Sequence, residues 1–162
     1  APEHRRYLEE VRKQMAAWGL AGRLEYQGAP DRAGKLAFLQ ALSVLCVPSP
    51  RPTQKGQFLL EAMASGIPGV QPRLGVFTEI VEKTGGGILT EPGDVDGLAR
   101  ALLALAADDE RRQQLGAAGH AGVRRYYGVS QMLTRVMDVY RSLLEIPSTR
   151  PSYTDPAATT VD

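Results

Sequence analysis

The sequence contains a single cysteine, Cys46, among its 162 residues. One thiol excludes an internal disulfide and a zinc site built from several cysteines. The neighbours of Cys46 are apolar and no base lies near it in the sequence, so a buried strand residue is a better interpretation than a nucleophile. This cysteine usage favours a reducing, cytoplasmic setting.

Neither sign of charge is in excess, and long apolar runs are absent. The chain has 19 basic and 18 acidic residues, a net charge of +1, so no global field would draw it to nucleic acid or to an anionic membrane. The longest apolar stretches, such as residues 38–47, are interrupted by Gln40 and Ser43, whereas a membrane-spanning helix needs about 20 apolar residues. The sequence therefore predicts neither a nucleic-acid partner nor a transmembrane segment.

The length and an apolar fraction of 43% suit one packed domain. The chain opens at Ala1 directly into an amphipathic segment, which is typical of a fragment. Residues 146–162 are rich in Pro, Ser and Thr and are expected to form a flexible tail. We therefore predict a domain over residues 1–145 followed by this tail.

Apolar spacing, together with glycine and proline positions, predicts an alternation of strands and helices. Leu8, Val11, Met15 and Trp18 recur at spacings of three and four, as on one face of a helix. Strands are expected at residues 23–27, 43–47, around 70 and at 88–90, and helices at 5–18, 31–42, 57–65, 77–83, 94–105, 110–127 and 130–144. This order predicts an α/β fold, with a parallel Rossmann-like sheet covered by helices and a helical C-terminal segment.

Several short motifs follow one another in a fixed order. Residues 44–49 read Val-Leu-Cys-Val-Pro-Ser, and residues 60–68 read Leu-Glu-Ala-Met-Ala-Ser-Gly-Ile-Pro. A G-x-x-x-E loop at 75–79, Gly-Gly-Ile-Leu at 86–89, Glu-Pro-Gly-Asp at 91–94 and Leu-Gly-Ala-Ala-Gly at 115–119 come next. Together they resemble the group 1 glycosyltransferases of the GT-B fold, over about residues 23–144.

The resemblance implies two Rossmann-like domains facing a cleft. The N-terminal domain mainly holds the acceptor and the C-terminal domain, which this chain resembles, binds a nucleoside-diphosphate sugar. Such enzymes transfer a hexose with retention, and helix N-termini can hold the diphosphate without a formal cation. We therefore expect no cofactor and no required metal, and a cytoplasmic parent that is peripheral to the inner face of a membrane or not attached to it.

The resemblance assigns donor binding first to the helix after the second strand. Glu61 matches a glutamate that accepts hydrogen bonds from the two ribose hydroxyls, a task that suits two carboxylate oxygens. Gly56, Gln57 and Phe58 match backbone amides that approach the sugar or its phosphate. The alternatives are a solvated or capping role for Glu61 and a plain turn at Gly56.

Further donor contacts are implied in the neighbouring loops. Gly28 and Ala29 match backbone groups that meet the nucleobase, although any strand-to-helix turn favours a glycine. Lys55 would neutralise a phosphate or be an ordinary surface lysine. Gly75 and Glu79 form the G-x-x-x-E loop, in which the glutamate either caps its own helix or touches the donor.

One catalytic position departs from the family's pattern. The motif has two glutamates separated by seven residues, and counting back from Glu61 leads to Thr53. Threonine cannot stabilise an oxocarbenium-like centre with a negative charge. If the first glutamate assists transfer in relatives, this chain is expected to be impaired at that step.

The second departure concerns the sheet. The family's strand order is 3-2-1-4-5-6, and nothing before Arg5 can supply the first strand, helix and strand with the Arg and Lys that hold the diphosphate. Residues 23–27 would then lie about 10 Å from the other strands, two interstrand spacings. We expect the gap to close by pairing of residues 23–27 with 43–47, or by exchange of segments in a homodimer.

The sequence leaves three functions to weigh. The first is the donor-binding part of a glycosyltransferase, inactive without its acceptor domain. The second is a degenerate nucleotide-binding or scaffold domain, which Thr53 and the missing strands favour. The third, a flavodoxin-like signalling receiver, needs an acidic cluster after early strands, where this sequence has Gly28 and Pro48.

Overall fold

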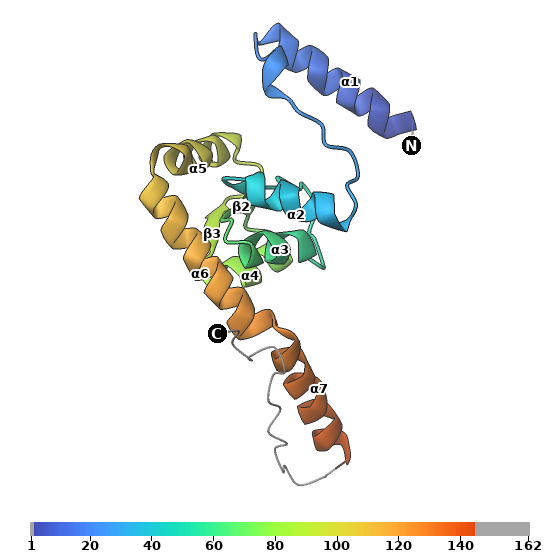
Figure 1. The fold of residues 1–162 in the computed structure, drawn as a ribbon, viewed down its shortest axis with the longest axis vertical. Helices are drawn as coiled ribbons and strands as arrows, with labels where there is room; N and C mark the ends of the chain where they lie inside the picture. The colour runs from blue at the N-terminus through green and yellow to red at the C-terminus, as the bar shows by residue number, and fades with distance from the viewer. Residues whose placement is uncertain (1, 145–162) are drawn as a thin grey trace, which may run out of the picture. The chain divides into compact units, whose positions relative to one another are not determined.

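The computed structural model describes residues 2–144. The chain divides into two units, which meet between Ala37 and Phe38. Figure 1 traces the elements in chain order. The predicted tail, residues 146–162, lies outside the described residues, so the predicted domain boundary stays a prediction.

The first unit begins with helix α1 (Pro2–Ala17). Of its predicted apolar stripe, Leu8, Val11 and Met15 are partly buried, whereas Trp18 lies just beyond the helix and is exposed. Gly19 adopts a φ of 71° and the amide of Leu20 donates to the carbonyl of Met15 at 2.8 Å, which ends the helix in a left-handed C-cap. The 3-10 turn η1 (Ala21–Arg23) follows.

The strand predicted at residues 23–27 does not form. Arg23 belongs to η1, and residues 24–27 join no sheet. The side chains of Gln27 and Glu25 hydrogen-bond to each other in solvent, so the segment satisfies polar groups locally and offers little apolar surface to a sheet. The predicted pairing of residues 23–27 with 43–47 is therefore wrong, while segment exchange between two chains stays a prediction.

Helix α2 (Arg32–Ala41) begins where the sequence predicts. Asp31 Oδ1 accepts a hydrogen bond from the amide of Gly34 at 2.8 Å, so the predicted N-cap is confirmed. The helix runs across the boundary between the units, and its Leu39 is buried.

The second unit contains a parallel three-stranded sheet in the order β1-β2-β3. Its strands are β1 (Leu45–Cys46), β2 (Gly69–Pro72) and β3 (Gly87–Thr90). Gly69 lies opposite Leu45 on one side and Gly87 on the other. The predicted parallel Rossmann-like α/β sheet is confirmed, with β1 shorter than expected and at one edge of the described sheet.

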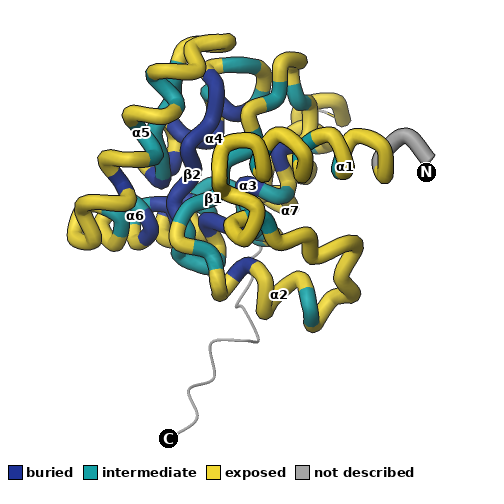
Figure 2. Tube along the Cα trace, turned by 90° about the horizontal axis from the view of Figure 1, so that it is seen from above, coloured by how far each residue is buried: buried dark blue, intermediate teal, exposed yellow. Residues whose placement is uncertain are grey.

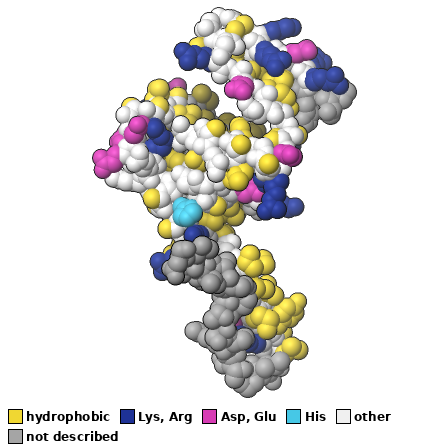
Figure 3. All heavy atoms as spheres, in the orientation of Figure 1, with side chains coloured by type: hydrophobic (Ala, Val, Ile, Leu, Met, Phe, Trp, Pro, Cys, Tyr) yellow, Lys and Arg dark blue, Asp and Glu magenta, His cyan; other side chains and the backbone are white. Residues whose placement is uncertain are grey.

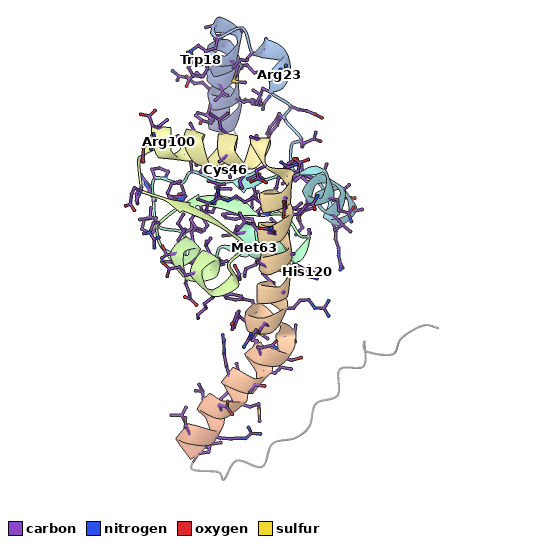
Figure 4. The ribbon with its side chains drawn as sticks, turned by 90° about the vertical axis from the view of Figure 1, so that its left-hand side faces the viewer. Trp18, Arg23, Cys46, Met63, Arg100 and His120 are labelled. Carbon is purple, nitrogen blue, oxygen red and sulfur yellow. The ribbon has the colours of Figure 1, made fainter. Side chains whose placement is uncertain are left out.

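Helices cover the sheet on both faces. The sheet lies between α5 (Val95–Ala107) on one side and α3 (Gln57–Ala64) with α4 (Val76–Thr84) on the other (Figure 4). Helix α6 (Asp109–Tyr127) packs along α3 and α4, and α7 (Val129–Leu144) follows it. No helix within residues 2–144 is long and apolar enough to cross a membrane.

The core lies between the sheet, α3 and α4, where Figure 2 shows the buried trace. Leu59, Met63, Phe77, Ile80 and Val81 form one buried cluster. Burying such side chains stabilises a fold by about 1.5–3 kcal/mol each. These contacts fix α3 and α4 on the same face of the sheet.

Glycines let α6 approach its neighbours at backbone distance. Gly116, Gly119 and Gly122 are buried at intervals of one turn. A Cβ on Gly122 would lie 2.6 Å from the Cα of Thr84, and one on Gly119 would lie 3.1 Å from the Cα of Gly86. Any side chain here would push α6 off the layer of α3 and α4.

A buried glutamine supports the edge strand. Gln71 on β2 is fully buried, its Oε1 accepts from the amide of Val47 at 3.2 Å, and its Nε2 donates to the carbonyl of Leu45 at 3.2 Å. The side chain thereby satisfies two backbone groups of β1 and its continuation. It holds the start of the loop that leads to α3.

Candidate donor-binding site

Two loops at the carboxyl edge of the sheet lead into helices. The chain leaves β1 through residues 47–56 and enters α3, and it leaves β2 through residues 73–75 and enters α4. Open parallel sheets bind ligands at this edge. Of the predicted donor-binding residues, Gly56 and Gly75 end these two loops, and Gln57 and Glu61 lie on α3.

Gly56 is the N-cap of α3 and is buried with a φ of 53°. A Cβ at this position would lie 2.7 Å from Ile80 Cδ1 and 2.8 Å from Val76 Cγ1, both on α4. A glycine is therefore required both by the backbone conformation and by the packing. It brings the first turns of α3 and α4 into contact.

Thr53 and Gly75 join the two loops. The carbonyl of Thr53 accepts a hydrogen bond from the amide of Val76 at 3.1 Å. Gly75 has φ 57° and ψ −138°, and a Cβ there would lie 2.8 Å from the Thr53 carbonyl oxygen. The structure thus brings together three residues that were predicted for this site, Thr53, Gly56 and Gly75.

Glu61 lies one turn into α3. It is partly buried, and its Oε1 accepts a long hydrogen bond of 3.5 Å from Gln57 Nε2. The side chain of Phe58 packs against the core, where its ring meets that of Phe77 edge-on at a centroid distance of 5.6 Å. Of the first-turn residues, Phe58 can therefore offer a ligand only its backbone.

The side chain of Glu79 contacts one residue on its own helix, α4, and one on α6. Its Oε1 accepts from Lys83 Nζ at 2.7 Å and from the hydroxyl of Tyr127 on α6 at 3.5 Å. The hydrogen bond from Lys83 is the main reason that the pKa of Glu79 is lowered, and the same bond raises the pKa of Lys83. This carboxylate ties α4 to α6, and a contact of Glu79 with the donor stays a prediction.

The remaining predicted residues are exposed. Lys55 lies in the loop before α3. Gly28, with a φ of 69°, and Ala29 belong to the first unit, so a nucleobase contact by these two residues stays a prediction.

A pocket that the sequence did not predict lies at the same edge of the sheet. Its volume is about 380 Å³, and it extends over the ends of all three strands. Its walls are Pro48, Ser49, Pro50, Pro72, residues 90–95 and Leu98. Pro48 and Pro72 begin the two loops that meet at Thr53 and Gly75, so the pocket adjoins the predicted site. In the sequence, the prolines that follow β1 and end β2 were the signal from which this pocket could have been predicted.

The described part of the chain was also searched for metal ligands and for an activated thiol. Within residues 2–144, no group of three or more His, Cys, Asp or Glu side chains could hold a metal ion. Burial raises the pKa of the Cys46 thiol, which disfavours a thiolate.

Comparison with known proteins identifies the family. A family model described as glycosyl transferases group 1 matches residues 2–108. The phosphatidyl-myo-inositol mannosyltransferase of Mycobacterium leprae is 36% identical over 135 residues, which are 83% of this chain and 35% of that protein. The chain belongs to the group 1 glycosyltransferases, as its motifs predicted.

Solved structures agree on the fold. A sucrose-phosphate synthase from Thermosynechococcus elongatus matches with a TM-score of 0.74 and 27% identity, over 90% of this chain and 35% of that one. HepE from Anabaena, solved in complex with UDP, matches with a TM-score of 0.77 and 23% identity, over 86% and 38%. The chain corresponds to the C-terminal domain of the family, and it spans about a third of the length of these relatives.

Proposed function

We propose that the chain binds a nucleoside-diphosphate sugar where the N-termini of α3 and α4 meet. The observation that carries this proposal is the hydrogen bond from Val76 to the carbonyl of Thr53, which fixes the two termini beside each other. The N-caps of α3 and α4 are the glycines Gly56 and Gly75, so no N-cap side chain hydrogen-bonds to the first amides of either helix. The dipoles of two adjacent helix N-termini suit a diphosphate, and the amides of Gly56 and Gln57 at the start of α3 would bind it, since the amide of Val76 already donates to Thr53.

Glu61 is proposed to bind the ribose. It lies one turn beyond the amides of Gly56 and Gln57, on the same helix, so one donor molecule would contact both. A ribose hydroxyl would replace the long contact of Glu61 with Gln57 by a shorter, charge-assisted bond. Lys55 would approach a phosphate, and Gly28 with Ala29 would approach the base.

The reaction proposed for the whole protein is hexosyl transfer with retention. Family membership supports transfer, and a relative named as a mannosyltransferase favours a mannosyl donor. The acceptor would lie mainly on a further domain, so this chain alone would bind the donor without transferring it. Independence from metal, a cytoplasmic location and attachment of the parent to a membrane face remain proposals.

A second candidate is a donor-binding domain that has lost catalysis. The position of the family's first glutamate is occupied by Thr53, and the loop at residues 48–56 contains no acidic residue. No carboxylate in that loop could therefore stabilise a positive charge at the anomeric carbon. In a longer protein with an acceptor domain, T53E should raise transfer if the missing carboxylate limits the rate, and should leave it unchanged if catalysis was lost elsewhere.

Calorimetry on the 162-residue chain tests donor binding. UDP, GDP and ADP, each free and linked to glucose or mannose, are titrated into the protein. We expect saturable heat with one nucleotide, and weakening of about tenfold or more in E61A, since a charged hydrogen-bonding group contributes about 1.5–3 kcal/mol.

Two variants serve as controls. E61Q keeps the shape and one acceptor oxygen, so it should bind between wild type and E61A. E110A changes an exposed glutamate on α6, whose recorded partner is Gln114 on the same helix, and should bind as wild type does. The absence of heat with every nucleotide would refute the proposal.

A further inference from the structure

One buried polar side chain of β2 lies on the face of the sheet that carries α3. Gln71 is fully buried, and it follows Gly69 by two residues, so both positions point to the same face. A Cβ on Gly69 would meet Leu59 of α3 and, at 3.7 Å, Cγ of Gln71. At about 3.3 Å per residue, Gln71 lies roughly 7 Å further along β2 toward the carboxyl edge, where α3 and α4 begin.

The side chain of Gln71 replaces part of the ladder between β1 and β2. The two strands pair only through Leu45 and Cys46 of β1. The next amide, that of Val47, donates to Gln71 Oε1 at 3.2 Å, while Gln71 Nε2 donates to the carbonyl of Leu45. Strand β2 itself continues to pair with β3 as far as Pro72. The two strands therefore separate at Gln71, and its side chain bridges them.

The bridge lies at the start of the loop that leads to α3. Two hydrogen bonds tie this loop, residues 47–56, to neighbouring segments. Gln71 holds the amide of Val47 near its start, and the carbonyl of Thr53 accepts from the amide of Val76 near its end. The direction in which the chain enters α3 therefore depends on the side chain of Gln71 as well as on the contact with α4.

The charges of the second unit offer a diphosphate little long-range attraction. On the face drawn in Figure 3, its Lys and Arg side chains are interspersed with Asp and Glu, and the net charge of the chain is +1. Donor binding would then depend on amides that are aimed at the phosphates. A displacement of about 1 Å is enough to weaken such contacts strongly.

We propose that Gln71 is a positioning residue for donor binding, which aims the amides of Gly56 and Gln57 at the diphosphate by holding the start of the loop. Gln71 is fully buried, so it acts without touching the donor. The inference rests on the donor site proposed above and names a residue that keeps that site in shape. A substitution of Gln71 should therefore alter the surroundings of those two amides before any donor is added.

NMR and calorimetry on the 162-residue chain test this role. In Q71L without donor, the ¹⁵N-¹H signals of Gly56 and Gln57 should move, because Val47 has lost its acceptor. Whichever of UDP-glucose and GDP-mannose binds the wild type should bind Q71L about tenfold more weakly. If Q71L fails to fold, Q71N replaces it, since its amide is one methylene too short to reach both partners and should cause the same changes to a smaller degree.

The matched control is T84V, which removes a buried side-chain hydrogen bond at the opposite end of α4. Thr84 is buried, and its Oγ1 accepts from the amide of Gly86 at 3.1 Å. T84V should lose stability in urea, as Q71L does, yet keep the Gly56 and Gln57 signals in place and bind the donor as wild type does.

Three results would each overturn the positioning role: unmoved Gly56 and Gln57 signals in ligand-free Q71L, wild-type affinity in Q71L, or equal weakening in T84V. Absence of binding by the wild type is a different result. It would refute the proposed donor site itself, and the role of Gln71 with it.

Discussion

The amide of Val76 donates a hydrogen bond of 3.1 Å to the carbonyl of Thr53. The bond joins the loop after β1 to the first turn of α4. The backbone of Thr53, which stands where the motif predicts the family's first glutamate, thus performs a structural task. Loss of the side-chain carboxylate and retention of the helix arrangement are therefore compatible.

Gly75 should be indispensable to this junction. Alanine would meet both a positive φ of 57° and the Thr53 carbonyl oxygen at 2.8 Å, and we expect G75A to lower the free energy of unfolding by about 3 kcal/mol. Urea denaturation measures the change. G93A is the control, because Gly93 has a φ of 82° but no atom within 4 Å of its added Cβ; it should cost about 1 kcal/mol. Equal losses would contradict the contact.

Replacing Gly122 by alanine should reverse the usual helix rule. Alanine in a helix interior is favoured over glycine by about 1 kcal/mol, but here the new Cβ would lie 2.6 Å from the Cα of Thr84. We expect G122A to destabilise the protein by about 2 kcal/mol in urea. The exposed neighbour Ala121 provides the comparison, since A121G should lose only about 1 kcal/mol. A more stable G122A would show that α6 does not pack this closely.

The side chain of Gln71 should hold strand β1 in the sheet. Leucine would fit the buried volume but leave the amide of Val47 and the carbonyl of Leu45 without its two hydrogen bonds, at a cost of about 2–4 kcal/mol. The rate at which a thiol reagent labels Cys46 reports on β1 directly, and it should rise in Q71L. Q113L, on an exposed position of α6, should leave the rate unchanged. Normal labelling in Q71L would contradict this role.

The Glu79–Lys83 pair should make stability depend on pH. The pKa of Glu79 is lowered in the folded state, so its contribution is fully present above its unfolded pKa, about 4.3, and is lost as the pH falls through the folded value. The pKa of Lys83 is raised, so its contribution is present below about 10.4 and is lost as the pH rises through the folded value.

Urea midpoints of wild type, E79Q, K83M and the double variant measure this coupling. The wild type should exceed E79Q at pH 7, and the two should converge in acid. Because both side chains are about half exposed, the difference at pH 7 should be small. Additive effects in the double variant would mean that the pair contributes nothing.

The fold was largely predictable because its signals are local. Apolar spacing with Gly and Pro at the ends predicted every helix of the second unit, and Asp94 and Asp108 cap α5 and α6 through their side chains. Residues 23–27 look like a strand by composition, but a strand also needs a neighbour. The strand was predicted from the residue pattern, which does not show whether a neighbouring strand is present, and residues 24–27 join no sheet.

The site was predictable only in part. Gly56 and Gly75 were predicted from motifs, but the reason that each must be a glycine lies elsewhere in the chain. A side chain at Gly56 would clash with α4, and one at Gly75 would clash with Thr53. The contact between Glu79 and Tyr127 was not predicted, because the two residues lie 48 positions apart in the sequence. The pocket depends on three strand ends that meet only after folding.

The most direct test maps donor binding on the protein by ¹⁵N-¹H NMR during titration with UDP-glucose and GDP-mannose. The proposal predicts that the amides of Gly56, Gln57 and Val76 shift with one of these donors, in a saturable manner that E61A weakens. Shifts confined to other surfaces, or no shift with either donor, would contradict the assignment of this edge of the sheet as the donor site.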